Sequence, residues 1–176
     1  MEILIVGIVI VALMAYASTK IKKSAAQAFE LEEIETEEFT IIKPEGFLNP
    51  INEKSAYAFE AYSKDLGKDE AKNLRQSWAT LRVDSNSDFQ TICKNAKSSA
   101  GTIFLKSFVE DAPDGQKIFL IEGRKTEKKV EIYSFWKIVE NRTRRKVYEL
   151  QVSVLEDCRE DFEEKARVMI ESFAVK

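Results

Sequence analysis

Residues 146–155 read K-V-Y-E-L-Q-V-S-V-L, and this stretch decides the fold. Apolar and polar side chains alternate along it: Tyr148, Leu150, Val152 and Val154 against Glu149, Gln151 and Ser153. A period of two is typical of a strand with one buried face and one wetter face, as antiparallel sheets have. The stretch therefore predicts one strand of an antiparallel sheet.

Three further strand-like runs precede it: Thr102–Val109, Gln116–Gly123 and Lys129–Val139. The segment 111–115, D-A-P-D-G, supplies turn residues for the first connection, and polar residues fill 124–128 and 140–145. The four runs predict a meander of consecutive antiparallel strands. Because Ile118–Ile121 is apolar on both faces, we expect its strand at the centre of the sheet with cover on both sides.

Two helices are expected to flank the meander. Ser87-x-x-Gln90 is a capping-box pattern that predicts a helix start, Gly101 marks its end, and Asp157-x-x-Glu160 predicts a second start. Apolar residues recur at helical spacing in each: Phe89, Ile92, Cys93, Ala96 and Ala100, then Cys158, Phe162, Ala166, Met169 and Phe173. Both cysteines read as small buried hydrophobic residues, and a disulfide between the two helices stays open.

The segment before the first helix contains three shorter strand candidates: Phe39–Lys43, Tyr57–Ser63 and Trp78–Val83. Pro44 to Gly46 ends the first, and the polar stretch Lys64–Arg75 reads as loop or short helix. Residues 39–176 are therefore expected to form one globular α+β domain, an antiparallel β-sheet sandwiched by helices.

Residues 3–17, I-L-I-V-G-I-V-I-V-A-L-M-A-Y-A, form an uninterrupted apolar run. With flanking residues and snorkelling lysines it reaches about the 30 Å of a hydrocarbon core. We expect a transmembrane helix with a lysine-rich flank over residues 1–23. Its anchoring residues are Ile3, Leu4, Ile8, Val11, Leu13, Tyr16, Lys20, Lys22 and Lys23. A cleaved signal peptide ending at Ala15-Tyr16-Ala17 and a buried core helix are the alternatives.

The positive charge beside this run lies after it, at Lys20, Lys22 and Lys23. The positive-inside rule then places the N-terminus outside the cell (inner) membrane and the C-terminal domain in the cytoplasm. An extracytoplasmic domain is the alternative. Residues 24–38 are expected to be a helical, acidic stalk, because six glutamates crowd into residues 30–38. That stalk reads as a self-repelling spacer or as a docking strip for a basic partner.

Two short segments carry a family resemblance. Lys43-Pro44-Glu45-Gly46-Phe47 resembles the P-x-G-aromatic opening of the Mog/PsbP-like fold family, and Met169-Ile170-Glu171-Ser172-Phe173 resembles its closing signature. The resemblance covers about residues 39–175 and implies a PsbP-like domain that works by binding other proteins. It carries over no catalytic residue, because the family offers none to match. Many relatives act outside the cytoplasm behind a signal peptide, whereas this chain has a lysine-flanked apolar run.

The composition excludes several kinds of chemistry. The chain has no histidine, so it cannot build a Ser–His or Cys–His nucleophile, an imidazole base or a His-bearing zinc site. A net charge of −3 disfavours nucleic acid as a partner. No glycine-rich phosphate loop is present. Glu122, Glu131 and Glu149 read as partners of Arg or Lys on neighbouring strands. We expect no enzyme, no cofactor and no metal.

Basic residues gather in two turns of the meander: Arg124, Lys125, Lys128 and Lys129 in one turn, and Arg142, Arg144, Arg145 and Lys146 in the next. Six of them are the candidate partner-binding residues: Arg124, Lys125, Arg142, Arg144, Arg145 and Lys146. Consecutive turns of a meander lie at opposite ends of the sheet, so the two clusters cannot face one membrane surface together. The sequence therefore predicts a non-catalytic, single-pass, membrane-anchored protein-interaction module. Its expected role is that of an accessory subunit of a larger membrane complex, an energy-transducing one included. The alternative is an envelope domain that binds a lipid or small ligand in an apolar pocket between sheet and helix.

Overall fold

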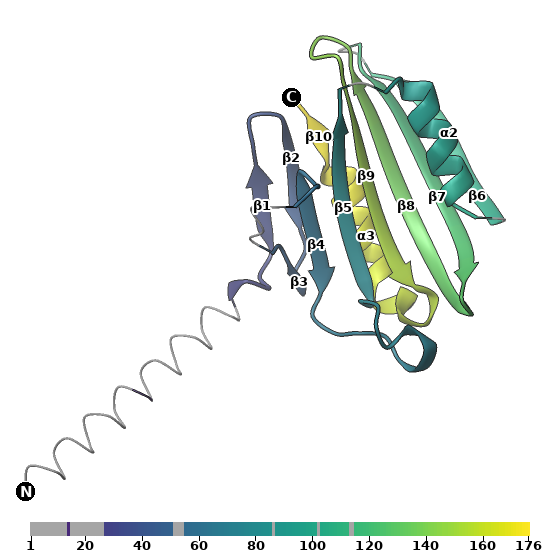
Figure 1. The fold of residues 1–176 in the computed structure, drawn as a ribbon. Helices are drawn as coiled ribbons and strands as arrows, with labels where there is room; N and C mark the ends of the chain where they lie inside the picture. Colours follow the sequence, from purple (N-terminus) through teal and green to yellow (C-terminus); the bar gives the residue numbers. More distant parts are fainter. Residues whose placement is uncertain (1–13, 15–26, 51–54, 86, 102, 113–114) are drawn as a thin grey trace, which may run out of the picture.

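The computed structural model describes residues 14, 27–50, 55–85, 87–101, 103–112 and 115–176 (Figure 1). Most of the described strands form one seven-stranded antiparallel sheet. Its order is β3 (Phe47–Leu48), β4 (Phe59–Ser63), β5 (Ser77–Asp84), β9 (Lys146–Leu155), β8 (Val130–Asn141), β7 (Lys117–Glu127) and β6 (Ile103–Asp111). Strands β6 to β9 are the predicted meander, and each pairs with the next in an antiparallel register.

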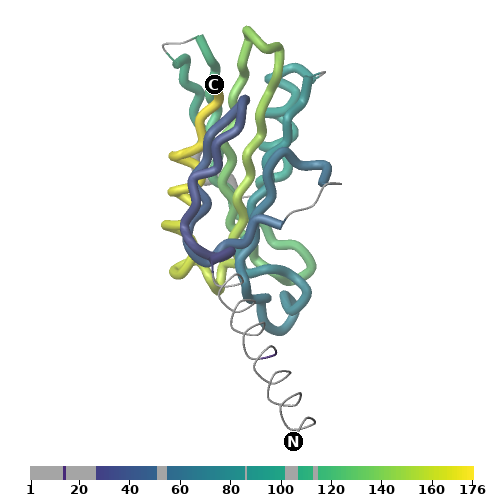
Figure 2. Tube along the Cα trace, turned by 90° about the vertical axis from the view of Figure 1, so that its left-hand side faces the viewer, coloured from purple at the N-terminus to yellow at the C-terminus, as the bar shows by residue number. Residues whose placement is uncertain are grey.

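The two α-helices lie on opposite faces of this sheet (Figures 1 and 2). Helix α2 (Phe89–Ser99) packs on one face against Phe119, Ile121, Trp136 and Ile138. Helix α3 (Arg159–Ser172) packs on the other face against aromatic and aliphatic residues of β8 and β9. Because successive side chains of β8 and β9 point to opposite faces of the sheet, these strands contribute residues to the core beneath each helix. The α+β antiparallel class is confirmed.

A smaller, three-stranded sheet completes the core beside α3. It consists of β1 (Glu32–Glu35), β2 (Phe39–Lys43) and β10 (Ala174–Val175), with β2 in the middle. Phe39 and Ile41 of β2 are buried in the same cluster as Met169 and Phe173, which end α3. Two short 3₁₀ turns, η1 (Asp69–Ala71) and η2 (Glu156–Cys158), complete the described helical segments.

The expected central place of the Ile118–Ile121 strand is wrong. Strand β7 is second from the edge, because β6 ends the sheet on that side. Phe119 and Ile121 are buried beneath α2, whereas Ile118 and Leu120 are only half-buried on the opposite face. Two apolar faces therefore indicated partial cover by both layers, and not a central position.

Both predicted helix starts need correction. At α2 the N-cap is Asp88, whose carboxylate accepts hydrogen bonds from the backbone of Gln90 and Thr91. Ser87 instead donates its hydroxyl to Asp84, which closes the turn before the helix. Helix α3 begins at Arg159 after η2 and has no side-chain cap. The Asp157-x-x-Glu160 pattern therefore predicted the position of α3 correctly within two residues but the wrong cap.

The β7–β8 turn is shorter than the sequence indicated. Pairing continues to Glu127 and Val130, so only Lys128 and Lys129 remain in the turn. Their positive φ angles of 50° and 70° match the twist that tight two-residue hairpins require. Arg124 and Lys125, which were expected in a turn, lie within strand β7.

The acidic segment also differs from the expected helical stalk. Residues Glu32–Glu35 form strand β1, which pairs with β2 from Glu32 opposite Lys43 to Glu35 opposite Thr40. Residues 24–26 lie outside the described residues, and so do all the anchoring residues of the apolar run. In the described part of the chain, no helix has both the length and the apolar character needed to cross a membrane.

A buried lysine fastens the start of the domain to its core. Lys43 is fully buried, and its Nζ donates to the carbonyl oxygens of Ala28 (2.9 Å), Glu30 (2.7 Å) and Phe47 (3.0 Å). The Glu32 carboxylate lies 3.7 Å from the same nitrogen. All three ammonium protons are thereby used, as a buried cation requires. Residues 28–30 are therefore held to the domain and do not hang from it as a free stalk.

Candidate binding surface

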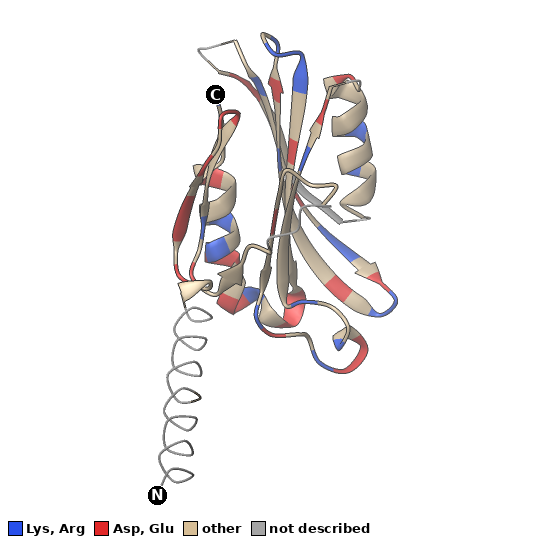
Figure 3. Ribbon diagram, turned by 60° about the vertical axis from the view of Figure 1, so that its left-hand side comes forward, with Lys and Arg blue, Asp and Glu red and all other residues tan. Residues whose placement is uncertain are grey.

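Basic side chains of the β8–β9 turn contact the acidic turn between β1 and β2. Figure 3 shows both turns at the same end of the domain. Lys146 donates through Nζ to Glu38, and Nη1 of Arg144 lies 4.0 Å from the same carboxylate oxygen. The Tyr148 hydroxyl donates to the other oxygen of Glu38 at 3.0 Å. The hydrogen bond from Lys146 lowers the pKa of Glu38. Burial, reinforced by Glu38, raises the pKa of Tyr148 to about 12.

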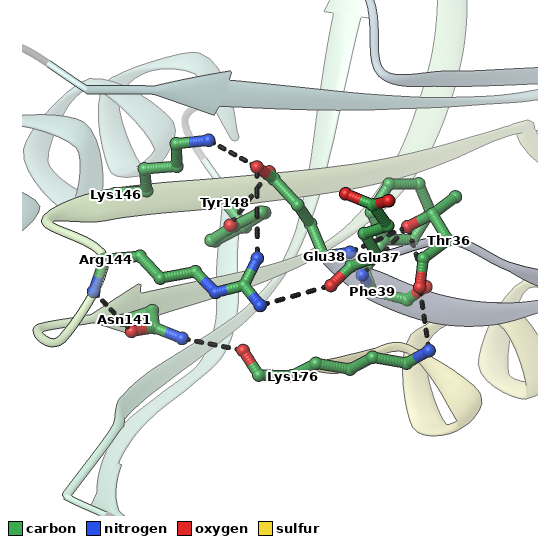
Figure 4. Close-up of polar contacts among 9 residues, drawn as sticks. All are labelled: Thr36, Glu37, Glu38, Phe39, Asn141, Arg144, Lys146, Tyr148 and Lys176. Atoms are coloured by element: carbon green, nitrogen blue, oxygen red, sulfur yellow. Dashed lines mark hydrogen bonds and ion pairs between the residues drawn. The ribbon is translucent and has the colours of Figure 1, made fainter.

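Further contacts extend this cluster to the C-terminus (Figure 4). Arg144 also donates to the carbonyl oxygen of Glu37, and the Asn141 amide donates to the carbonyl oxygen of Lys176. Lys176 Nζ in turn donates to the Thr36 carbonyl and the Glu35 carboxylate, each at 2.7 Å. We call these contacts the Glu38 network, formed by Thr36, Glu37, Glu38, Asn141, Arg144, Lys146, Tyr148 and Lys176. Its chemistry is structural, because its cations are matched by acceptors of the chain itself.

The other predicted partner-binding cations are matched in the same way. Arg142 pairs with Glu140 at 3.2 Å, and Lys125 pairs with Glu127 at 3.1 Å. Arg124 reaches both Glu131 and Glu156 at 3.4 Å. Among the described residues, Arg145 alone of the six candidates has no ion pair. The two clusters lie at opposite ends of the sheet, and among the described residues Lys128 and Lys129 of the β7–β8 turn also form no ion pair.

Unmatched positive charge gathers elsewhere, in a groove between α2 and strands β6 and β7. The groove has a volume of about 380 Å³. We call it the lysine groove, lined by Phe89, Gln90, Cys93, Lys94, Lys97, Val109, Lys117 and Phe119. No carboxylate belongs to this lining. Within the described residues, none of its three lysines forms an ion pair.

The groove is built by two elements. Lys94 and Lys97 are one turn apart on α2, and Lys117 opens β7. Lys97 Nζ lies 5.0 Å above the centre of the Phe119 ring, so its stem is held over the groove by a cation–π contact. Asp111 of β6 faces Lys117 in the strand register without forming an ion pair within 4 Å among the described residues.

Close packing fixes α2 on the sheet beside the groove. A Cβ at Gly123 of β7 would lie 2.6 Å from the Cβ of Ala100, so glycine is needed where the end of the helix meets the strand. Gly101 then turns the chain with φ of +89°, a conformation that suits glycine. Cys93 of α2 belongs to the buried cluster between this helix and the sheet, and burial raises the pKa of its thiol to about 12. The thiol is therefore protonated and unreactive at neutral pH.

Two of the other cavities of the domain adjoin the helices. One, of about 160 Å³, lies between α3 and the sheet and is lined by Phe108, Leu120, Phe135 and Ile170 among others. The other, of about 350 Å³, is polar and lies between η1, η2 and the β7–β8 hairpin. In the described part of the chain, no group of three or more acidic or cysteine side chains is placed to hold a metal ion. Cys93 and Cys158 are both free thiols.

Two of the three glutamates singled out in the strands face an arginine of a neighbouring strand, as predicted, and the third does not. Glu131 pairs with Arg124 of the neighbouring strand, and Glu149 lies opposite Arg82 in the β5–β9 register. Burial raises the pKa of Glu149. Glu122 instead pairs with Arg167 of α3 at 3.0 Å, so its partner is in another layer.

The lysine groove was missed at the sequence level. Lys94 and Lys97 show the spacing of neighbours on one helix face, which is a usable signal. Lys117, however, follows 20 residues later, and only the packing of α2 over β7 brings it beside them. The two basic clusters were predicted to bind a partner because their residues are close together in the sequence. Closeness in the sequence does not show whether a residue forms an ion pair in the folded chain.

Comparison with known proteins supports the fold and nothing finer. No family model matches the chain, and no curated protein matches it in sequence. Among solved structures, cyanobacterial PsbP (CyanoP) from Synechocystis sp. PCC 6803 superposes with a TM-score of 0.57 at 14% identity, over 84% of this chain and 94% of that one. The fold is PsbP-like.

Two further solved structures match most of the chain at low identity. LpqN of Mycobacterium tuberculosis, described as involved in cell envelope biogenesis, has a TM-score of 0.57 at 10% identity, over 84% of this chain and 91% of its own. The Ran-binding protein Mog1p of Saccharomyces cerevisiae has a TM-score of 0.48 at 12% identity, over 84% and 96%. At these identities the likeness extends to the PsbP-like fold of the domain and leaves its partners to be inferred from its own surface.

Proposed function

We propose that this chain is a non-catalytic protein-interaction module, tethered to the inner membrane by residues 1–23 with its domain in the cytoplasm. Its role is that of an accessory subunit of a larger membrane complex. One observation carries the proposal: five of the six candidate partner-binding cations form ion pairs within the domain, whereas the three lysines around one groove form none among the described residues. Uncompensated charge of one sign on a folded surface favours association with a complementary partner.

The groove itself speaks against catalysis. Its single thiol is held protonated by burial, and its remaining polar groups are three lysines and one glutamine. A nucleophile or general base needs a neighbour that activates it or a pKa near the working pH. The lysine groove offers cations for recognition and no such pair.

The small size of the apolar cavity beneath α3 disfavours the alternative of an envelope lipid-binding domain. The apolar cavity between α3 and the sheet measures about 160 Å³. Sites for small molecules and cofactors usually measure about 300–1,000 Å³. An acyl chain would therefore find too little enclosed space in the cavity between α3 and the sheet.

Native electrophoresis tests this proposal. We expect the chain, after mild detergent solubilisation of native membranes, to migrate with a complex far larger than its own 20.2 kDa, and mass spectrometry to give the same co-migrating proteins in replicate. A chain lacking residues 1–23 should be lost from the membrane fraction. Migration of the intact chain by itself would contradict a stable accessory subunit, and retention of the truncated chain would contradict the tether.

A further inference from the structure

We infer that the free edge of β1 binds a basic segment of a partner protein, which joins the three-stranded sheet as a fourth strand. The segment alternates basic and apolar residues. This edge belongs to the smaller sheet, whereas the lysine groove lies on the seven-stranded one. The inference therefore goes beyond the proposed function, because it assigns the domain a second contact with a partner of the opposite charge.

The first observation is a row of backbone groups that β1 directs outward. Among the described residues β1 pairs with β2 alone and forms one edge of its sheet (Figure 1). The Thr36 N–H donates to the Phe39 carbonyl at 2.9 Å, and bonded pairs alternate with non-bonded pairs along an antiparallel ladder. In the same register Glu35 and Glu33 occupy non-bonded positions, so their N–H and C=O groups point away from β2. Edges of this kind are templates for an added strand.

The second observation is that β1 is fixed without a partner. Glu32 lies 3.7 Å from the buried Lys43 Nζ, and Glu35 accepts a hydrogen bond from Lys176 at 2.7 Å. Both ends of the strand are therefore tied to the rest of the domain. Because the backbone of β1 need not be ordered on binding, the entropy cost of adding a strand beside it is reduced.

The third observation is the charge on the exposed face of β1. Glu33 and Glu35 lie on this face, and Figure 3 shows acidic residues along the strand. Glu35 is 70% exposed although it pairs with Lys176. Among the described residues Glu33 forms no ion pair, and neither do the exposed Glu30 and Glu37, which precede and follow the strand. Carboxylates in these positions favour Lys or Arg at the cross-strand positions of an added strand.

The opposite face of β1 selects apolar residues between the basic ones. Ile34 is half-buried and packs against the main core cluster. Successive residues of a strand point to opposite faces, so the residue of an added strand beside Ile34 would extend the apolar layer. Alternation of basic and apolar residues therefore matches both faces of the edge.

The same charges disfavour other occupants. A second copy of the chain would bring its own β1 glutamates beside Glu33 and Glu35, and like charges on neighbouring strands are destabilising. The phosphates of a nucleic acid or of an anionic bilayer would be repelled in the same way. A basic peptide segment is therefore the occupant that matches both the backbone groups and the charge of the edge.

A peptide of defined sequence tests the inference on the full chain, purified in a mild detergent. The probe is a fluorescein-labelled peptide of alternating Lys and Val, and fluorescence anisotropy reports its binding. We expect saturable binding that Glu33→Lys weakens about tenfold, because an attractive charge on the edge becomes a repulsive one. The matched control Glu70→Lys makes the same charge change at an exposed glutamate of η1 and should leave binding unchanged.

Two methylated peptides distinguish strand addition from simple charge attraction. One carries a methyl group on the backbone nitrogen of every Lys, and the other on that of every Val. Only one alternate set of N–H groups faces the neighbouring strand, so one peptide should lose binding and the other should keep it. Both peptides are tested on the unmodified chain, so this result does not depend on the folding of Glu33→Lys.

Four outcomes would overturn the inference. They are absence of saturable binding, equal loss of binding in Glu33→Lys and Glu70→Lys, equal binding of the two methylated peptides, and self-association of the chain that Glu33→Lys abolishes. The last outcome would assign the β1 edge to a second copy of the chain. None of them bears on the lysine groove, so the proposed function is tested separately by native electrophoresis.

Discussion

Glu38 is the residue on which one end of the domain depends. Its carboxylate receives Lys146 and Tyr148, and Arg144 lies 4.0 Å away, so it joins the β1–β2 hairpin to the β8–β9 turn (Figure 4). Glu38 is half-buried, and charge-assisted hydrogen bonds in such positions stabilise more than exposed ion pairs do. The glutamates that read as a spacer in the sequence thus include the centre of a structural network.

Replacing Glu38→Gln should lower the free energy of unfolding by about 1–2 kcal/mol at pH 7, because two hydrogen bonds to a charged group are weakened. The folded-state pKa of Glu38 lies below its ordinary value. Its contribution is therefore present above that ordinary value and is lost as the pH falls through the lowered pKa. Urea unfolding should show a large difference at pH 7 and little difference at about pH 2. Glu37→Gln, at an exposed neighbour, is the control, and an equal loss in both variants would contradict the role of Glu38.

Tyrosine ionisation should limit stability in alkali. Burial raises the pKa of Tyr148 and Tyr133 to about 12 in the folded state, against an ordinary value of 10.0. The unfolded chain therefore loses these protons first, and stability falls as the pH rises from 10 to 12. We expect Tyr148→Phe to flatten part of this fall in thermal unfolding measured across that range. An unchanged slope would show that Tyr148 ionises alike in both states.

Lys43→Met tests whether the buried lysine fastens the domain's first residues. The change leaves the carbonyls of Ala28, Glu30 and Phe47 without their donor, and we expect a loss of about 2–4 kcal/mol in the free energy of unfolding. Hydrogen exchange should rise most in the amides of residues 28–32. Lys64→Met, at an exposed lysine, should change neither quantity. Unaltered exchange at residues 28–32 in Lys43→Met would contradict the fastening.

At the scale of elements, the N-cap of α2 is Asp88 in the structure, whereas the sequence pattern indicated Ser87. Asp88→Ala removes the carboxylate that receives the Gln90 and Thr91 amides and should cost about 1 kcal/mol of stability. Ser87→Ala removes only the contact with Asp84 and should cost clearly less. Denaturant unfolding of the two variants decides between them. A larger loss in Ser87→Ala would restore the capping box that the sequence indicated.

The meander could be read from the sequence because its signal is local. Alternation along residues 146–155 and the turn residues at 111–115 specify strands and connections with short-range information. Strand β1 could not be read in this way. Its glutamates disfavour a strand by propensity, and partners distant in sequence stabilise it: Lys43 beside Glu32 and Lys176 beside Glu35. Tertiary contacts outweighed local preference there.

At the scale of the whole molecule, the arrangement of charge matters more than its sum. The net charge of −3 correctly describes an acidic chain but hides a groove with three unmatched lysines. The basic runs were predicted to bind a partner, and five of the six residues singled out in them are paired within the fold. Pairing depends on which strands and turns become neighbours, so the candidate site could be found only from the folded structure.

Site-specific photo-cross-linking in native membranes tests the lysine groove most directly. A benzophenone amino acid is placed at Lys97, within the groove, or at Lys68, an exposed lysine of the segment beside η1. We predict a discrete cross-linked product of higher mass from position 97 and none from position 68. Products of equal yield from both positions, or a product from position 68 alone, would contradict the lysine groove as the docking surface.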